Sequence, residues 1–227
     1  SRGLGDVYKR QNKDSIQAIE LLESLELETS NTVLQLRIEA QSMKQNEDWE
    51  QAAVAFKKAI EQSNDPVEMA WIEFELIDMQ LEQENYEELE VRLSELRGHS
   101  NTEILVQAHI RSAQWFIQTD QPSEALEILS AVDAQQLGPG WDTSLEELRA
   151  VSYRELGDYE RAIAVYLALA DRWPNNEEAE IPAWLGIASI HQQTGTVSQA
   201  REWAQRVADN AEDPVYQAQA EAILSAL

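Results

Sequence analysis

The 227-residue sequence contains no cysteine, so neither a disulfide framework nor a thiolate metal site can form. Basic residues are also scarce: 17 Lys and Arg stand against 42 Asp and Glu, for a formal net charge of −25. Nucleic acids and anionic membrane surfaces need clustered basic side chains, so this charge argues against both as partners. It permits a basic partner, but a solvated acidic outer face is the favoured interpretation. No apolar run approaches the ~20 residues of a membrane span.

Groups that could support chemistry are few. The three histidines, His99, His109 and His191, lie far apart in the sequence, and none stands in an H-E-x-x-H frame. We interpret His99 as a solvated turn residue and the other two as half-buried packing residues. No phosphate-binding loop is present, and Gly138 and Gly140 do not follow a strand as a dinucleotide fingerprint requires. The sequence therefore predicts no catalytic, cofactor-binding or metal-binding residues, and a protein that is not an enzyme.

A repeated pattern of apolar residues is the main positive signal. Residues 145–176 predict two amphipathic helices joined by a short turn at residues 156–159. A small residue at a fixed place in the second helix recurs along the chain at intervals of 34 to 38 residues, at Ala18, Ala52, Leu89, Ala125, Ala162 and Ala200. A large apolar residue follows four positions later in most copies, as with Phe56 and Tyr166. Such a pair lies on one helical face, where the small residue lets two helices approach.

Proline and glycine agree with this period. Pro66, Pro139, Pro174 and Pro214 fall where one helix pair should give way to the next, because proline cannot continue a helix. Gly157 and Gly195 fall in turns within pairs, where a left-handed residue ends a helix. Pro122 and Pro182 lie near predicted helix starts. No segment alternates with the period of a strand, so the fold is predicted to be all-α.

These features resemble the tetratricopeptide repeat, a helix–turn–helix unit of about 34 residues. The resemblance is carried by Ala150, Tyr153, the Gly157-Asp158-Tyr159 turn and the Ala162/Tyr166 pair, and by the Trp184-x2-Ile187-Ala188 start of the next pair. It implies a right-handed α-solenoid of tandem repeats over residues 12–227. We expect the second helix of a truncated repeat, about five full repeats, and a capping helix from Pro214 onward.

Residues 1–11 do not match the repeat. With one codon per residue they back-translate to a sequence that resembles a transposon-type sequencing adapter, so we expect them to be non-native and to add nothing to the fold. A helix that should precede residues 12–15 is replaced by this stretch. We therefore expect the chain to be a gene fragment cut within a repeat, and any signal or domain upstream is not visible.

The resemblance implies a scaffold that binds a peptide or a helix of a partner protein in a concave groove lined by the first helices. The places matching the groove combine an apolar middle with basic flanks, and the predicted peptide-binding residues are Arg37, Gln41, Lys44, Trp71, Phe74, Leu81, Ile110, Gln114, Ile117 and Arg154. Glu147 and Val151 occupy places of the same kind. Family members that grip a C-terminal carboxylate use lysine and asparagine where this chain has Arg37 and Gln41, which argues against that mode.

Alternatives from other classes stay open. The chain could be the regulatory arm of a larger enzyme or sensor, and its long intervals also resemble bacterial envelope proteins that assist outer-membrane assembly or cell division. A carbohydrate hydrolase built as a helical toroid would need longer repeats. The partner, the oligomeric state and a cytoplasmic or periplasmic location are not decided by the sequence.

Overall fold

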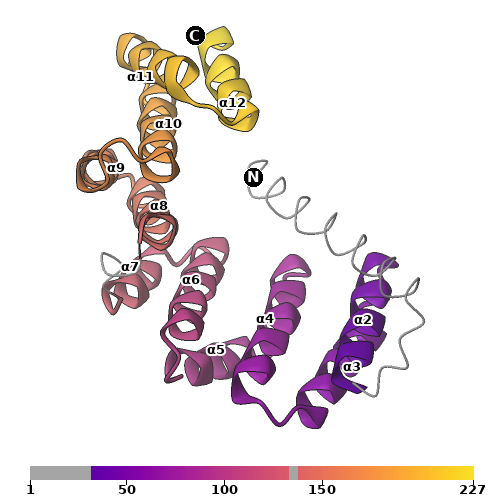
Figure 1. The fold of residues 1–227 in the computed structure, drawn as a ribbon. Helices are drawn as coiled ribbons and strands as arrows, with labels where there is room; N and C mark the ends of the chain where they lie inside the picture. The colour runs from indigo at the N-terminus through magenta and orange to yellow at the C-terminus, as the bar shows by residue number, and fades with distance from the viewer. Residues whose placement is uncertain (1–31, 133–137) are drawn as a thin grey trace. The chain divides into compact units, whose positions relative to one another are not determined.

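The computed structural model describes residues 32–132 and 138–227 (Figure 1). Every helix or strand in these ranges is an α-helix, which confirms the all-α prediction for them. The helices are α2 (Thr32–Gln45), α3 (Trp49–Gln62), α4 (Pro66–Glu82), α5 (Leu89–Arg97), α6 (Thr102–Gln118), α7 (Pro122–Ser130), α8 (Pro139–Glu155), α9 (Tyr159–Arg172), α10 (Glu177–Gln193), α11 (Val197–Asn210) and α12 (Pro214–Ser225). The chain divides into two compact parts, residues 1–89 (unit 1) and residues 90–227 (unit 2).

The described part of unit 1 is built around α3, whose apolar face lies between α2 and α4. Ala52, Phe56 and Ala59 on this face are fully buried, and they share one core cluster with Ala40 of α2 and Ile72 of α4. The alanines allow the helices to approach closely, and the Phe56 ring fills the space beside them. The start of α4 is fixed by Pro66 and by the Asp65 carboxylate, which accepts a hydrogen bond from the Val67 amide at 2.9 Å.

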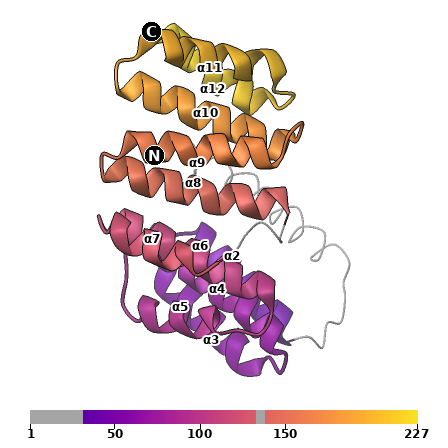
Figure 2. The same cartoon turned by 90° about the vertical axis from the view of Figure 1, so that its left-hand side faces the viewer.

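Unit 2 stacks helix pairs in chain order, with α8 to α11 in successive layers (Figure 2). The small residues Ala125, Ala162 and Ala200 lie on α7, α9 and α11, and all three are fully buried. Leu129 and Tyr166, four positions after two of them, are buried in the same cores. The spacing of these residues therefore predicted correctly which face of each second helix is buried.

In each described helix pair, the residue five positions before the small residue of the second helix has a left-handed backbone. Two of these are the predicted Gly157 (φ 76°) and Gly195 (φ 74°), and the equivalent positions in the other pairs are Glu47, Glu84 and Asp120, with φ between 54° and 61°. A non-glycine residue is strained in this region by roughly 1 kcal/mol. The turn geometry is thus kept in all five pairs even where the sequence lacks glycine.

Pro182 lies inside α10 rather than at its start, which corrects the sequence-based placement. A proline has no amide N–H, so the Glu178 carbonyl four residues earlier loses its helical partner. The Thr143 hydroxyl on α8 donates to this carbonyl at 3.0 Å. A hydrogen bond from the neighbouring helix pair therefore replaces the one that the proline removes, and α10 continues without a break.

Several sequence-based expectations fall outside the described residues. The adapter-like residues 1–11, the Ala18 helix and the truncated first repeat all lie within residues 1–31. At the other end α12 packs against α10 and α11, as expected for a helix at this place. A single continuous array over residues 12–227 stays a prediction, because the two units are described separately.

Candidate protein-interaction surface

The first helices of the pairs in unit 2 form one continuous face. Helix α8 contacts α6 and α10, and α10 also contacts α12, whereas comparable contacts are not formed between the second helices α7, α9 and α11. Helices that approach one another lie on the inside of a curved stack. We refer to the face formed by α6, α8, α10 and α12 as the inner surface of unit 2.

On α8 the inner surface carries Glu147, Val151 and Arg154, all partly exposed. Burial raises the pKa of Glu147 to about 7, and burial is the one cause of this shift. The Glu147 carboxylate lies near two tyrosines, because its charge helps to raise the pKa of both Tyr166 on α9 and Tyr216 on α12, after burial in each case. Arg154 forms an ion pair with its neighbour Glu155 at 3.1 Å.

The predicted residues on α6 are less accessible than expected. Ile110 is buried, with 8% of its surface exposed, and it packs with Val106 and Leu145 in the core of unit 2. Gln114 and Ile117 are partly exposed. Ile110 is thus a packing residue between α6 and its neighbours.

The basic residues predicted on α2 are already paired within unit 1. Arg37 donates to the Glu75 carboxylate at 2.6 Å, and Lys44 donates to Glu82 at 3.0 Å. In each pair the base and the acid are 38 residues apart, so the two ion pairs link α2 to α4 side by side. The sequence analysis recognised the bases but not these acids, because acids are abundant throughout the chain.

Two predicted apolar residues on α4 are buried. Phe74 is 1% exposed and Leu81 is 8% exposed, whereas Trp71 is partly exposed and meets the Phe74 ring edge-on at 5.6 Å. The expectation that Phe74 and Ile110 form part of an exposed apolar patch is therefore wrong, because both side chains are enclosed. Trp71 and the partly exposed Gln41 on α2 stay predicted binding residues.

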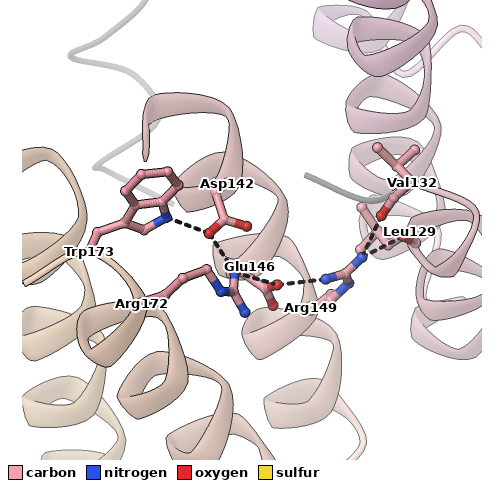
Figure 3. A network of polar contacts seen from close by, with 7 residues as sticks. All are labelled: Leu129, Val132, Asp142, Glu146, Arg149, Arg172 and Trp173. Carbon is pink, nitrogen blue, oxygen red and sulfur yellow. Dashed lines mark hydrogen bonds and ion pairs between the residues drawn. The ribbon is translucent and has the colours of Figure 1, made fainter. Parts of the chain in front are cut away.

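A buried network of polar side chains links α7, α8 and α9 (Figure 3). The fully buried Asp142 accepts hydrogen bonds from Arg172 and from the Trp173 indole, the latter at 2.7 Å. Glu146 bridges Arg172 and Arg149, and Arg149 donates in turn to the last carbonyls of the α7 region, those of Leu129 (2.7 Å) and Val132 (3.1 Å).

This network holds three successive helices in one arrangement, and we assign it a structural role. The sequence did not predict this network, because Asp142 and Glu146 resemble the many surface acids of the chain. The one available signal was that each stands on an otherwise apolar helix face, beside the buried Leu145.

The histidines are packing or turn residues, as predicted. His109 is buried and donates through Nδ1 to the Leu105 carbonyl at 2.7 Å, and burial lowers its pKa. Burial also lowers the pKa of the partly exposed His191. His99 accepts a hydrogen bond from the Asn101 amide in the loop before α6. Across residues 32–132 and 138–227, no three His, Asp or Glu side chains are grouped closely enough to hold a metal ion.

None of the helices described is long and apolar enough to cross a membrane. Comparison with known families gives one match, to the tetratricopeptide repeat, over residues 147–214. No curated protein matches the chain. The matched residues run from α8 through α11, where the small-residue spacing and the turn glycines are observed. Repeats of this family generally mediate protein–protein interactions and are typically not catalytic. Residues 147–214 are therefore identified as tetratricopeptide repeats.

Proposed function

We propose that the inner surface of unit 2 binds a peptide segment of a partner protein, and that Glu147 contacts a hydrogen-bond donor or cation of that segment. The surface offers apolar and polar groups side by side, with Val151 and Ile117 next to Glu147 and Gln114 in the helix positions that face inward. This mixture suits a segment that presents both its backbone and its side chains.

The observation that supports the proposal is the partly exposed Glu147 carboxyl group, whose pKa is raised to about 7 by burial. A carboxylate that loses water on burial is destabilised unless an opposite charge or a donor replaces the water. For Glu147, burial is the one cause of the raised pKa. A lysine, an arginine or a backbone N–H of a bound segment would supply such a donor and gain a hydrogen bond to a charged group.

The experiment is a selection of peptides from a random displayed library on the intact chain, followed by titration of the selected peptides. We expect Val151→Ala to weaken binding several-fold, because it removes an apolar contact beside Glu147 without adding a charge. Glu147→Gln should weaken binding of peptides that carry a cation at the contact. Melting curves of both variants establish that the helices stay folded.

Leu167→Ala provides the control, since Leu167 is an exposed residue of α9, a second helix. It should leave the affinity unchanged. Selected peptides that bind all three variants as tightly as the parent chain would rule out the inner surface of unit 2 as their site.

A further inference from the structure

Helix α5 begins later than the other second helices. In the other pairs the second helix starts three residues before the buried small residue, at Trp49, Pro122, Tyr159 and Val197. The equivalent residue of the α5 pair is Tyr86, but this helix starts only at Leu89, and Glu88 adopts a left-handed backbone (φ 60°). Residues 86–88 therefore form turns where the repeat elsewhere has a first helical turn.

A cavity of about 690 Å³ lies in unit 1 between α3, α4 and this non-helical segment. Its apolar wall is formed by Trp49, Ala53, Val54, Leu76 and Met79. Val54 belongs to the small set of large apolar side chains in the described residues that are exposed, at 48%. An open cavity with an aromatic and aliphatic wall is a common form of docking site for a side chain of a partner.

The rim of the cavity is strongly acidic. It carries Glu47, Asp48 and Glu50 at the start of α3, and Glu87 and Glu88 on the opposite side, with Lys57 as the single base among the described lining residues. In this part of the chain the acids are not gathered into a group that could hold one metal ion. Their spread along two sides of the opening matches an extended cationic segment better than a single ion.

Two glutamines in the cavity add a separate observation. Both line it, and the Gln80 Oε1 and Gln83 Nε2 atoms are buried without a hydrogen-bond partner in the described structure. Buried polar atoms are seldom left unpaired, since each costs about 1–3 kcal/mol. Gln80 Oε1 requires a donor and Gln83 Nε2 an acceptor, and a peptide segment supplies both through its N–H and C=O groups.

We propose that this cavity of unit 1 binds a basic segment of a partner protein, with an arginine or lysine side chain inserted between the Trp49 ring and the acidic rim. The aromatic wall attracts a cation through its ring face, and the rim carboxylates pair with the charge. This site is separate from the inner surface of unit 2 and does not depend on the function proposed there.

The test is a titration of the intact chain with a short fluorescent peptide of alternating arginine and serine, at physiological salt. We expect saturable binding, and a rise in Kd of about fivefold to tenfold in the double variant Glu50→Gln/Glu87→Gln, which removes one charge from each side of the opening. Both residues are exposed, so the substitutions should leave the melting temperature unchanged.

The matched control is Glu124→Gln/Glu127→Gln, which removes the same charge from exposed positions of α7. It should bind the peptide like the parent chain. An equal loss in both double variants would show general attraction to an acidic protein and overturn the proposal. Absence of saturable binding, or displacement of the peptide by millimolar calcium alone, would also overturn it.

Discussion

Individual carboxylates in this protein have opposite roles although the sequence makes them look alike. Asp142 is fully buried and paired with Arg172 and Trp173, whereas Asp158 forms a pair with the largely exposed Arg161 at 3.2 Å. A buried pair that loses one partner leaves an uncompensated charge, but an exposed pair is already screened by water. The environment, not the residue type, decides how much each acid contributes to stability.

We predict that Asp142→Ala lowers the free energy of unfolding by about 1–3 kcal/mol, because Arg172 and the Trp173 indole lose their fully buried acceptor and Arg172 keeps only its longer contact with Glu146. The control Arg161→Ala should cost less than about 1 kcal/mol, since its pair with Asp158 is exposed. Denaturant titrations of both variants test this. A similar small effect for both would show that the network of Figure 3 contributes little to stability.

The raised pKa of Glu147 predicts that its contribution to stability falls with rising pH, whereas that of most acids increases. Its pKa in the folded chain is raised from 4.5 to about 7. Between these values the folded chain holds a proton that the unfolded chain has released, so this group makes stability fall as the pH rises through the window. Above pH 7 we therefore expect the parent chain to have lost about 1–3 kcal/mol of its free energy of unfolding through this group, a loss that Glu147→Gln should not show.

The measurement is the free energy of unfolding of the parent chain and of Glu147→Gln at a series of pH values from 4 to 8. Glu155→Gln, an exposed acid on the same helix, should follow the parent curve. Parallel curves for Glu147→Gln and the parent would contradict the raised pKa.

At the scale of helices, α10 depends on a neighbouring helix for its regularity. Pro182 removes one internal hydrogen bond and Thr143 on α8 provides the replacement. Consecutive helix pairs are thus joined by a specific hydrogen bond in addition to apolar packing. The sequence showed the proline but not the replacement hydrogen bond, because Thr143 and Glu178 are 35 residues apart.

We predict that Thr143→Val lowers the free energy of unfolding by about 1–3 kcal/mol, because the Glu178 carbonyl is left unpaired. In a Pro182→Ala background the new amide can bond to this carbonyl, so the same substitution should cost clearly less. A double-mutant cycle measures the difference. Additive effects would show that the Thr143 hydroxyl does not stand in for the missing amide.

At the scale of the whole chain, stability in a repeat protein is a sum of terms between neighbouring repeats. Each unit has its own apolar clusters, such as the Phe56 cluster of unit 1 and the Tyr166 cluster of unit 2. A substitution that disrupts one cluster should therefore lower the local stability mainly of the helices that form this cluster.

Gly186 offers a test of this locality. A Cβ atom at this position of α10 would lie 2.3 Å from the buried Tyr166 ring on α9, so the ring or the helix must shift. We predict that Gly186→Ala lowers the free energy of unfolding by about 1–3 kcal/mol. Hydrogen exchange should accelerate in α8 to α11, while amides of α3 and α4 keep their protection. Equal acceleration in both units would show that the chain unfolds as one cooperative body.

The sequence by itself predicted the all-α fold and which face of the second helices α3, α7, α9 and α11 is buried. Those features depend on local periodicity and on small residues such as Ala52, Ala125, Ala162 and Ala200, which act wherever the chain brings two neighbouring helices together. Only the tertiary structure decided which residues of the first helices are accessible. Phe74 and Trp71 look equivalent as apolar residues of one helix, but contacts with distant segments enclose one and leave the other partly exposed. The same holds for charge: in a chain with 42 acids, only folding shows that Arg37 meets Glu75, that Asp142 is buried, and that burial raises the pKa of Glu147.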